Sequence, residues 1–360
     1  MSGSRHSVRL CPQCGASAPD TERFCGNDGT SLDPAPPIAS RVSDSGPPSS
    51  RPCANCGALR SDDGDGYCSA CGRRLLSRSA PPSGNRSVPP EHELVVVEAR
   101  RLAACVHPGL CRDHNEDAAS LGEGTTPKGE PYYVLVVCDG VSSSSRAEQA
   151  SAIAARVVRD VLTTFCETGN VNAESAKGAV AQALRDANDA VCAEDAAASG
   201  QEPPGTTCVA ALVVGNRLVV GWAGDSRAYW LTERGAQLLT RDHSWANDAV
   251  ARGEATLEEA IRLPHAHDLT RCLGPMESGE RPRLDVDVVG RELKAPGRLL
   301  LCTDGLWNYY PLPEQMGELL MGRQRAQTPG QLASFLVHRA LVRGGQDNVS
   351  VAVYLHTSRT

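Results

Sequence analysis

The chain has 360 residues, of which 41% are hydrophobic, 22% are charged and only 4% are aromatic. This is enough apolar material for one large domain with smaller appendages. The formal net charge of −7 argues against nucleic-acid binding by the chain as a whole. The longest apolar runs are strand-sized, so we expect no membrane span. We find no secretory signal, and therefore expect a cytoplasmic, reducing location in which the 15 cysteines are thiols or metal ligands.

Two similar cysteine-rich blocks form an internal repeat near the N-terminus. The second block, 53–76, has two Cys-x-x-Cys turns, which bring four thiolates to one tetrahedral zinc. Its candidate ligands are Cys53, Cys56, Cys68 and Cys71. The first block, 1–33, has an aspartate in place of the fourth cysteine, and its candidate ligands are Cys11, Cys14, Cys25 and Asp28. Each block is too short to bury a core, so zinc has to supply the folding energy.

The first block has two interpretations. It binds zinc through three cysteines and a carboxylate, which zinc chemistry allows, or it has lost the metal and Asp28-Gly29 is an ordinary turn. Both blocks resemble zinc ribbons, so we expect one zinc ion, or two if Asp28 is a ligand. Residues 34–52 and 77–92 are rich in proline and serine, which is typical of linkers.

The ribbons lack the features of a nucleic-acid reader. Residues 1–92 hold 10 Lys and Arg against 9 Asp and Glu, and their only aromatic residues are Phe24 and Tyr67. A basic stripe and stacking platforms are therefore absent from the sequence. We expect the ribbons to select a protein partner.

From residue 93 onward, strand-sized apolar runs alternate with amphipathic helical patterns, which predicts a mixed α and β domain. The expected strands are 133–138, 209–214, 218–222, 299–302 and 349–355. The expected helices are 147–165, 173–197 and 331–342.

Acidic residues stand at the ends of several of these strands. A single Asp-Gly is more often a turn than a site, but carboxylates gathered at one sheet end repel one another unless cations compensate them. Oxygen ligands without histidine favour Mg²⁺ or Mn²⁺ over zinc. The acids in question are Glu116, Asp117, Asp139, Asp225, Asp304 and Asp347.

Seven motifs occur in an order that carries a family resemblance over residues 93–356. They are Gly109-Leu-Cys-Arg-Asp-His-Asn-Glu-Asp117, Asp139-Gly140, Gly205-Thr-Thr207, Gly224-Asp-Ser-Arg227, Leu269-Thr-Arg271, Asp304-Gly305 and Gly345-Gln-Asp-Asn348. The segment resembles the metal-dependent serine/threonine protein phosphatases of type 2C, bacterial branch. The resemblance implies an α+β fold, a four-layer α/β/β/α sandwich of two antiparallel sheets flanked by helices. It also implies hydrolysis of phosphoserine and phosphothreonine in proteins at a centre of two Mn²⁺ or Mg²⁺ ions.

The resemblance assigns metal ligands residue by residue. Asp139 bridges both metals, and the carbonyl of Gly140 binds one of them. Asp304 and Asp347 resemble ligands of the other metal. Asp225 resembles the ligand of a third, weaker metal shared with Asp304.

Three further residues complete the implied site. Glu116 and Asp117 hold metal-bound waters, and Arg112 grips the substrate phosphate through its forked guanidinium. A surface ion pair is the alternative for Arg112, and its spacing to Glu116 makes that alternative less favoured. The implied nucleophile is a water shared by two cations, so no covalent intermediate is needed.

The sequence departs from the family pattern at several places. Val141 stands where many eukaryotic members have a histidine thought to act as general acid, so a water on a third cation becomes the expected proton source. Residues 142–145 are four serines, which we interpret as a solvated turn, and 240–268 resembles the family's mobile flap. Cysteine-based catalysis is disfavoured because Cys138, Cys208 and Cys302 lie inside apolar strands.

A hypothesis from a different class is a pseudophosphatase, or a zinc-ribbon adaptor, that binds phosphoproteins without turnover. Its weakness is that every implied metal-ligand position is filled. The expected partners of the chain are a phosphorylated protein substrate and a protein bound by the ribbons.

Overall fold

A computed structural model describes residues 8–10, 17–19, 95–141, 146–195, 204–274, 284–320 and 328–357. The chain divides into two compact units, Met1–Arg51 and Pro52–Thr360. In the first unit, β1 (Val8–Leu10) pairs antiparallel with β2 (Ser17–Pro19). All candidate zinc ligands, both linkers and the serines at 142–145 lie outside the described residues.

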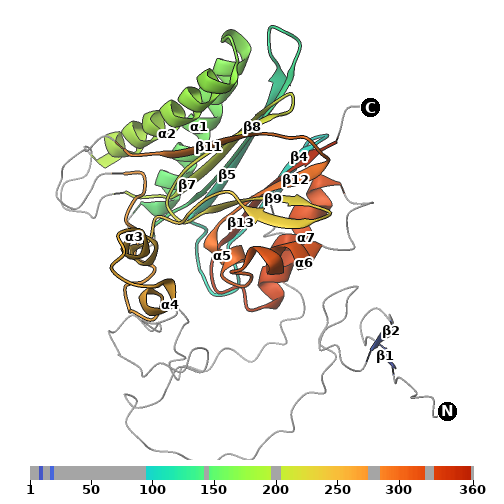
Figure 1. Ribbon diagram of the computed structural model, residues 1–360, viewed down its shortest axis with the longest axis vertical. Coiled ribbons are helices and arrows are strands. Elements are labelled where there is room, and N and C mark those ends of the chain that lie inside the picture. The colour runs from blue at the N-terminus through green and yellow to red at the C-terminus, as the bar shows by residue number, and fades with distance from the viewer. Residues whose placement is uncertain are drawn as a thin grey trace, which may run out of the picture. The chain divides into compact units, whose positions relative to one another are not determined.

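The second unit contains two antiparallel sheets (Figure 1). The six-stranded sheet has the order β10-β9-β12-β13-β4-β3. Its strands, in chain order, are β3 (Val95–Glu98), β4 (Leu102–His107), β9 (Arg227–Thr232), β10 (Gly235–Leu238), β12 (Gly297–Cys302) and β13 (Val349–His356).

The five-stranded sheet has the order β11-β8-β7-β6-β5. Its strands are β5 (Asp117–Thr125), β6 (Pro131–Asp139), β7 (Cys208–Val214), β8 (Arg217–Ala223) and β11 (Asp287–Glu292). Every residue of β7 is buried, because this central strand has one face toward the other sheet and one toward helices. Its unbroken apolar sequence follows from that position.

Helices cover the outer face of each sheet. The long pair α1 (Ala147–Thr168) and α2 (Ala173–Asp195) packs on the five-stranded sheet, with one apolar stripe of α1 facing β5 and β6. The six-stranded sheet is covered by α5 (Asp304–Trp307), α6 (Pro313–Leu320) and α7 (Pro329–Val342). A third apolar cluster fills the space between the sheets. The expected four-layer sandwich is thereby confirmed.

Local signals explain where the helices begin. Thr328 caps α7, since its hydroxyl accepts from the Gln331 amide while the Gln331 side chain accepts from the Thr328 amide, and Pro329 follows in the first turn. A similar capping box at Thr256 starts α4 (Leu257–Ala260). This short helix follows α3 (Trp245–Ala251) within the segment 240–268.

All five expected strands and all three expected helices are present, with ends that differ by a few residues. The remaining strands were not expected from the sequence. Among them, β5 contains two glycines and is half-exposed, and the edge strands β10 and β11 are short and largely accessible. Without a continuous apolar run, pattern reading has no signal for them.

Candidate active site

The acidic residues expected to converge do so at one end of the sandwich. Asp117 opens β5 and lies directly opposite Asp139, the last residue of β6. Asp225 follows β8, Asp304 opens α5 directly after β12, and Asp347 precedes β13. Antiparallel pairing brings these strand ends together although the residues are up to 230 positions apart in the chain.

Burial and mutual repulsion shift the titration of these carboxyls. Burial first, and then the neighbouring charges of Asp117, Asp304, Asp225 and Asp347, raise the pKa of Asp139 well above its usual range. Burial is also the main cause for Asp304, whose pKa rises to about 7. Without a counter-ion these carboxyls therefore tend to keep their protons, and full ionisation of the cluster needs a nearby cation.

Asp117 provides the sharpest test of whether a cation fits. Its side chain is only 7% exposed, and Oδ2 accepts a 2.9 Å hydrogen bond from the Thr303 hydroxyl. Burial, opposed by the Ser350 and Thr303 hydroxyls and reinforced by the charges of Asp304 and Asp347, raises its pKa to about 8. The second oxygen, Oδ1, is buried and has no hydrogen-bond partner. Such an oxygen costs free energy unless a cation or its bound water satisfies it, so the residues present fit a hard divalent ion.

A hydroxyl network holds the backbone around Asp139. The Thr207 hydroxyl accepts from the Asp139 amide at 3.1 Å, and the Thr206 hydroxyl donates to the Asp139 carbonyl at 2.9 Å. Thr207 also shares a 2.8 Å hydrogen bond with Ser226. The Gly140 amide donates to the Glu116 carbonyl at 3.1 Å. This network positions the two carboxylate-bearing strand ends relative to each other.

Asn348 is a positioning residue to which sequence reasoning assigned no role. Its Oδ1 accepts from the Glu116 amide at 2.7 Å, while its amide nitrogen donates to the carbonyls of Pro108 and His114. It therefore fastens the Arg112–Asp117 segment to the start of β13. The signal was available, since Asn348 follows Asp347 in one of the motifs, but only the fold shows what it holds.

Arg112 forms an ion pair inside this cluster. Its Nη2 lies 2.9 Å from Asp347 Oδ2, and both side chains are partly exposed, at 27% and 32%. Its ion-pair partner Asp347 is distant in the chain and is itself one of the implied metal ligands. Close backbone packing makes this contact possible, because Gly109 has a φ of +82° and a Cβ there would lie 2.1 Å from the Asp347 carbonyl.

Within the described ranges, no three acidic, histidine or cysteine side chains already surround one point as a complete metal site. The carboxylates instead hold protein partners: Asp347 pairs with Arg112, and Asp304 Oδ2 accepts from Asn308 at 3.1 Å. The donors are all oxygen atoms, which is the set that Mg²⁺ and Mn²⁺ prefer.

Asp225 lies in the turn between β8 and β9. Gly224 before it has a φ of +112°, and a Cβ there would lie 2.5 Å from Thr207, so only glycine fits. Burial first, and then the charges of Asp304 and Asp242, raise the pKa of Asp225 well above its usual range. His243 supports the turn, since its Nδ1 accepts from the Gly224 amide at 3.1 Å and its Nε2 lies 2.9 Å from Asp287.

Two other sequence interpretations concern residues around the site. His265, of unknown role from the sequence, packs edge-on against Trp245 at 4.1 Å between ring centroids. Cys138, Cys208 and Cys302 are fully buried, and burial raises the pKa of the Cys138 and Cys302 thiols. Their role in core packing is confirmed, since a nucleophilic cysteine needs the opposite shift.

Comparison with known proteins agrees with this geometry. Residues 112–337 match the family model described as Protein phosphatase 2C, and residues 11–79 match the model described as Double zinc ribbon. The serine/threonine phosphatase stp of Listeria monocytogenes is 29% identical over 243 residues, which are 68% of this chain and 90% of that protein.

Solved structures show the same likeness. The serine/threonine phosphatase PstP/Ppp of Mycobacterium tuberculosis is 29% identical with a TM-score of 0.57, covering 71% of this chain and 98% of that one. The catalytic domain of PstP in complex with two manganese ions is 29% identical with a TM-score of 0.54, covering 73% and 99%. Fold, acidic cluster and relatives together define a serine/threonine protein phosphatase. More particularly, the chain belongs to the protein phosphatase 2C family, whose model matches more than half of it.

Proposed function

We propose that this chain hydrolyses phosphoserine and phosphothreonine in proteins with the help of two divalent cations, Mn²⁺ or Mg²⁺. The observation that carries the proposal is the buried, unpartnered Oδ1 of Asp117 within a cluster of mutually repelling carboxyls. Asp139 and the Gly140 carbonyl would hold the cations together with Asp304 and Asp347. Glu116 and Asp117 would act through bound waters, and Asp225 would hold a third, weaker ion.

When bound, the cations supply an acidified water for attack on phosphorus and neutralise charge on the phosphate oxygens. The chain's own contribution begins with Arg112, whose planar fork suits two phosphate oxygens at once. Arg112 is paired with Asp347 here, so it would exchange that carboxylate for the substrate phosphate. During this exchange, Thr303 would hold the Asp117 side chain in place. Asn348 would hold the Glu116 backbone.

The variant Asp139→Asn tests this proposal. Removing the charge of the central carboxylate should lower release of phosphate from a phosphothreonine peptide by about a hundredfold or more, because the cations lose a ligand. Asp160→Asn is the matched control: Asp160 lies on α1, its side chain is 51% exposed and it pairs with its neighbour Arg159. It should keep near-normal activity. If Asp139→Asn keeps most of the activity, the proposed centre is wrong.

We further propose that the N-terminal ribbons bind zinc and a protein partner. The match to the double zinc ribbon model supports this, as does the repeated cysteine spacing. The proposal includes a cytoplasmic location, because a reducing compartment keeps the cysteines available as zinc ligands. No helix among the described residues has the length and apolar character to cross a bilayer.

A further inference from the structure

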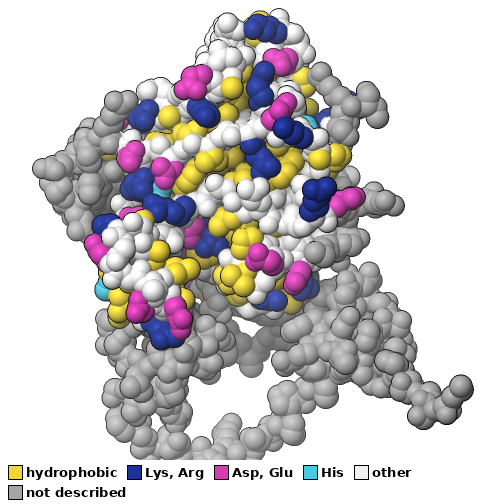
Figure 2. Space-filling view, viewed as in Figure 1, with side chains coloured by type: hydrophobic (Ala, Val, Ile, Leu, Met, Phe, Trp, Pro, Cys, Tyr) yellow, Lys and Arg dark blue, Asp and Glu magenta, His cyan; other side chains and the backbone are white. Residues whose placement is uncertain are grey.

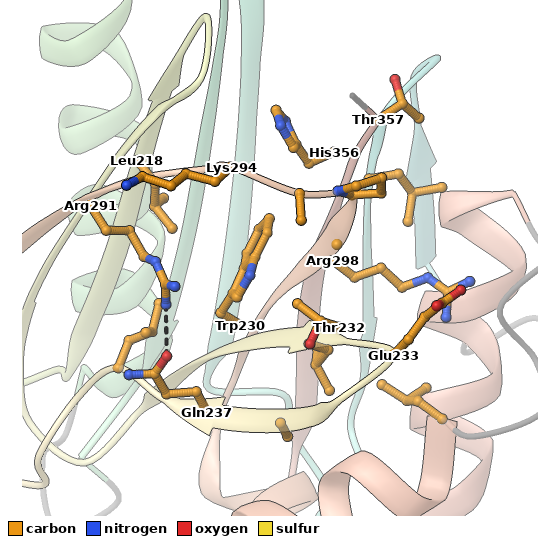
Figure 3. A pocket seen from close by; sticks show the side chains of 18 of the residues that line it. Leu218, Trp230, Thr232, Glu233, Gln237, Arg291, Lys294, Arg298, His356 and Thr357 are labelled. Atoms are coloured by element: carbon orange, nitrogen blue, oxygen red, sulfur yellow. Dashed lines mark hydrogen bonds between the residues drawn. The ribbon is translucent and has the colours of Figure 1, made fainter. Parts of the chain in front are cut away.

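A groove opens between the two sheets on the side where both have an edge strand (Figure 3). We call it the edge groove. It is lined by all of β10, by Val289–Glu292 of β11 and by the neighbouring parts of β8, β9, β12 and β13. It includes Gly297, at the opposite end of β12 from Cys302 and Asp304. At about 3.3 Å per residue the groove therefore lies roughly 15–20 Å from the acidic cluster.

The floor of the edge groove is apolar. Leu218, Val220 and Trp230 line it, belong to the cluster between the sheets and are buried, with exposed fractions of only 1%, 1% and 5%. Val289 is 39% exposed on the rim. Figure 2 shows apolar side chains on this face with lysine and arginine side chains around them.

The rim carries an excess of positive charge, although the whole chain is acidic with a net charge of −7. Two of the three acids there already accept hydrogen bonds: Glu98 from the Gly330 amide and Glu292 from the Asn216 side chain. Arg234 and Lys294 are exposed and form no ion pair among the described residues. The charged lining residues are Arg100, Arg234, Arg291, Lys294 and Arg298 against Glu98, Glu233 and Glu292.

Arg291 has an unmet hydrogen bond inside the groove. Its Nη1 donates to Gln237 of the opposite rim at 2.8 Å, and its guanidinium lies 5.8 Å from the ring centroid of Trp230. Its Nε is buried and has no hydrogen-bond partner. Since Arg291 as a whole is only partly buried, a small shift of its side chain would let the guanidinium fork bind two carboxylate oxygens and satisfy Nε.

The backbone of the rim points to an extended ligand. Among the residues that the structure describes, β10 pairs with β9 alone and β11 with β8 alone, so each leaves one edge without a neighbouring strand. Such edges accept an added peptide strand, in which main-chain hydrogen bonds supply affinity and alternate side chains supply specificity.

We propose that the edge groove binds an extended acidic peptide segment of a partner protein, with carboxylates toward Arg291 and Lys294 and apolar side chains toward the Trp230 floor. The alternation of acidic and apolar residues follows from the period of two in a strand. The binding does not depend on phosphatase chemistry, since the groove is separate from the acidic cluster.

The probe is a fluorescein-labelled (Glu-Val)₄ peptide, titrated with the full chain in a chelator-free buffer and followed by fluorescence anisotropy. Lys294→Glu and Arg234→Glu, both at exposed positions, should each weaken binding about threefold to fivefold, and the double variant about tenfold or more. The control Arg156→Glu makes the same charge change at an exposed position of α1, outside the groove. It should stay within about twofold of the original chain.

Three results would overturn the proposal. The first is equal binding by the two groove variants and the control. The second is binding of (Lys-Val)₄ as tight as that of (Glu-Val)₄, which would show that charge does not select the ligand. The third is an oligothymidylate of equal charge that competes as well as the unlabelled peptide, which would show a general anion surface.

Discussion

At the scale of single residues, Asp225 has a position that suits a metal ligand and a surrounding that does not suit an ordinary turn. A turn aspartate is normally solvated, whereas burial and the charges of Asp304 and Asp242 raise the pKa of Asp225. Val141 occupies the place of a candidate general acid, and its amide donates to the Gly205 carbonyl. We propose that Asp225 would hold an ion there, whose bound water would supply the proton for the leaving oxygen.

The variant Asp225→Ala tests whether Asp225 holds a catalytic ion or only shapes the turn between β8 and β9. We expect turnover of a phosphothreonine peptide to fall about a hundredfold, while an aryl phosphate, with its better leaving group, loses less than about tenfold. Asp189→Ala, at an exposed position of α2, is the control and should change neither rate. Peptide turnover at the normal rate would refute the third-ion role, and calorimetry should still find two bound ions.

Some features of the site could be predicted from the sequence and others could not. The acidic residues were predictable because each stands beside an apolar run or in a motif. The ion pair between Arg112 and Asp347 was not, because it joins residues 235 positions apart. The same holds for the Thr303 hydroxyl on Asp117, which depends on the pairing of strands rather than on local sequence.

At the scale of elements, Arg227 joins three segments that surround the acidic cluster. Its guanidinium makes two bonds to Asp242 at 2.9 and 2.7 Å, so it holds β9 to the start of the flap segment 240–268. It lies 3.7 Å from the ring centroid of Trp307 in α5, and it donates to the Pro311 carbonyl at 3.0 Å. α5 begins at Asp304, so this contact fixes the element that carries a proposed ligand.

Replacing Arg227 with lysine should destabilise the chain by about 1–3 kcal/mol, because lysine keeps the charge but loses the fork and the flat stacking surface. The readout is the midpoint of urea unfolding with Mn²⁺ present. Arg159→Lys is the matched control, since Arg159 also pairs with a carboxylate but is 35% exposed, and it should shift stability by less than about 0.5 kcal/mol. Equal shifts in both variants would contradict the joining role of Arg227.

Elements with strong periodicity were the predictable ones. The apolar stripe of α1 and the continuous run of β7 predict their own burial. The edge strands and the one-turn helices were missed because their sequences are mixed and their conformation is set by neighbours, as when α6 packs against β10. The edge groove arises from these same elements, so sequence reasoning had no access to it.

At the scale of the whole molecule, the chain combines a phosphatase domain with a matched double zinc ribbon region. We expect the full chain, purified under reducing conditions, to hold one tight zinc ion through Cys53, Cys56, Cys68 and Cys71. A second zinc at the block containing Asp28 should be weaker or absent. Atomic emission on the chain, on Cys53→Ser and on Cys11→Ser checks this.

Cys53→Ser should lose the tight zinc, and Cys11→Ser should keep it. Both variants should retain Mn²⁺-dependent phosphatase activity, because the acidic cluster lies in a different part of the sequence. A chain without any zinc would remove the ribbon assignment, and two equally tight ions would show that Asp28 is a competent ligand.

The most direct test of the central claim is phosphate release from a phosphothreonine peptide by the full chain, first with chelator and then with Mn²⁺ or Mg²⁺ restored in excess. When ionised, crowded carboxyls such as Asp117, Asp139 and Asp304 would repel an anionic substrate unless a divalent ion were bound. We predict that chelation lowers the rate by about a hundredfold or more and that either ion restores it. An undiminished rate after exhaustive chelation would contradict the two-cation account.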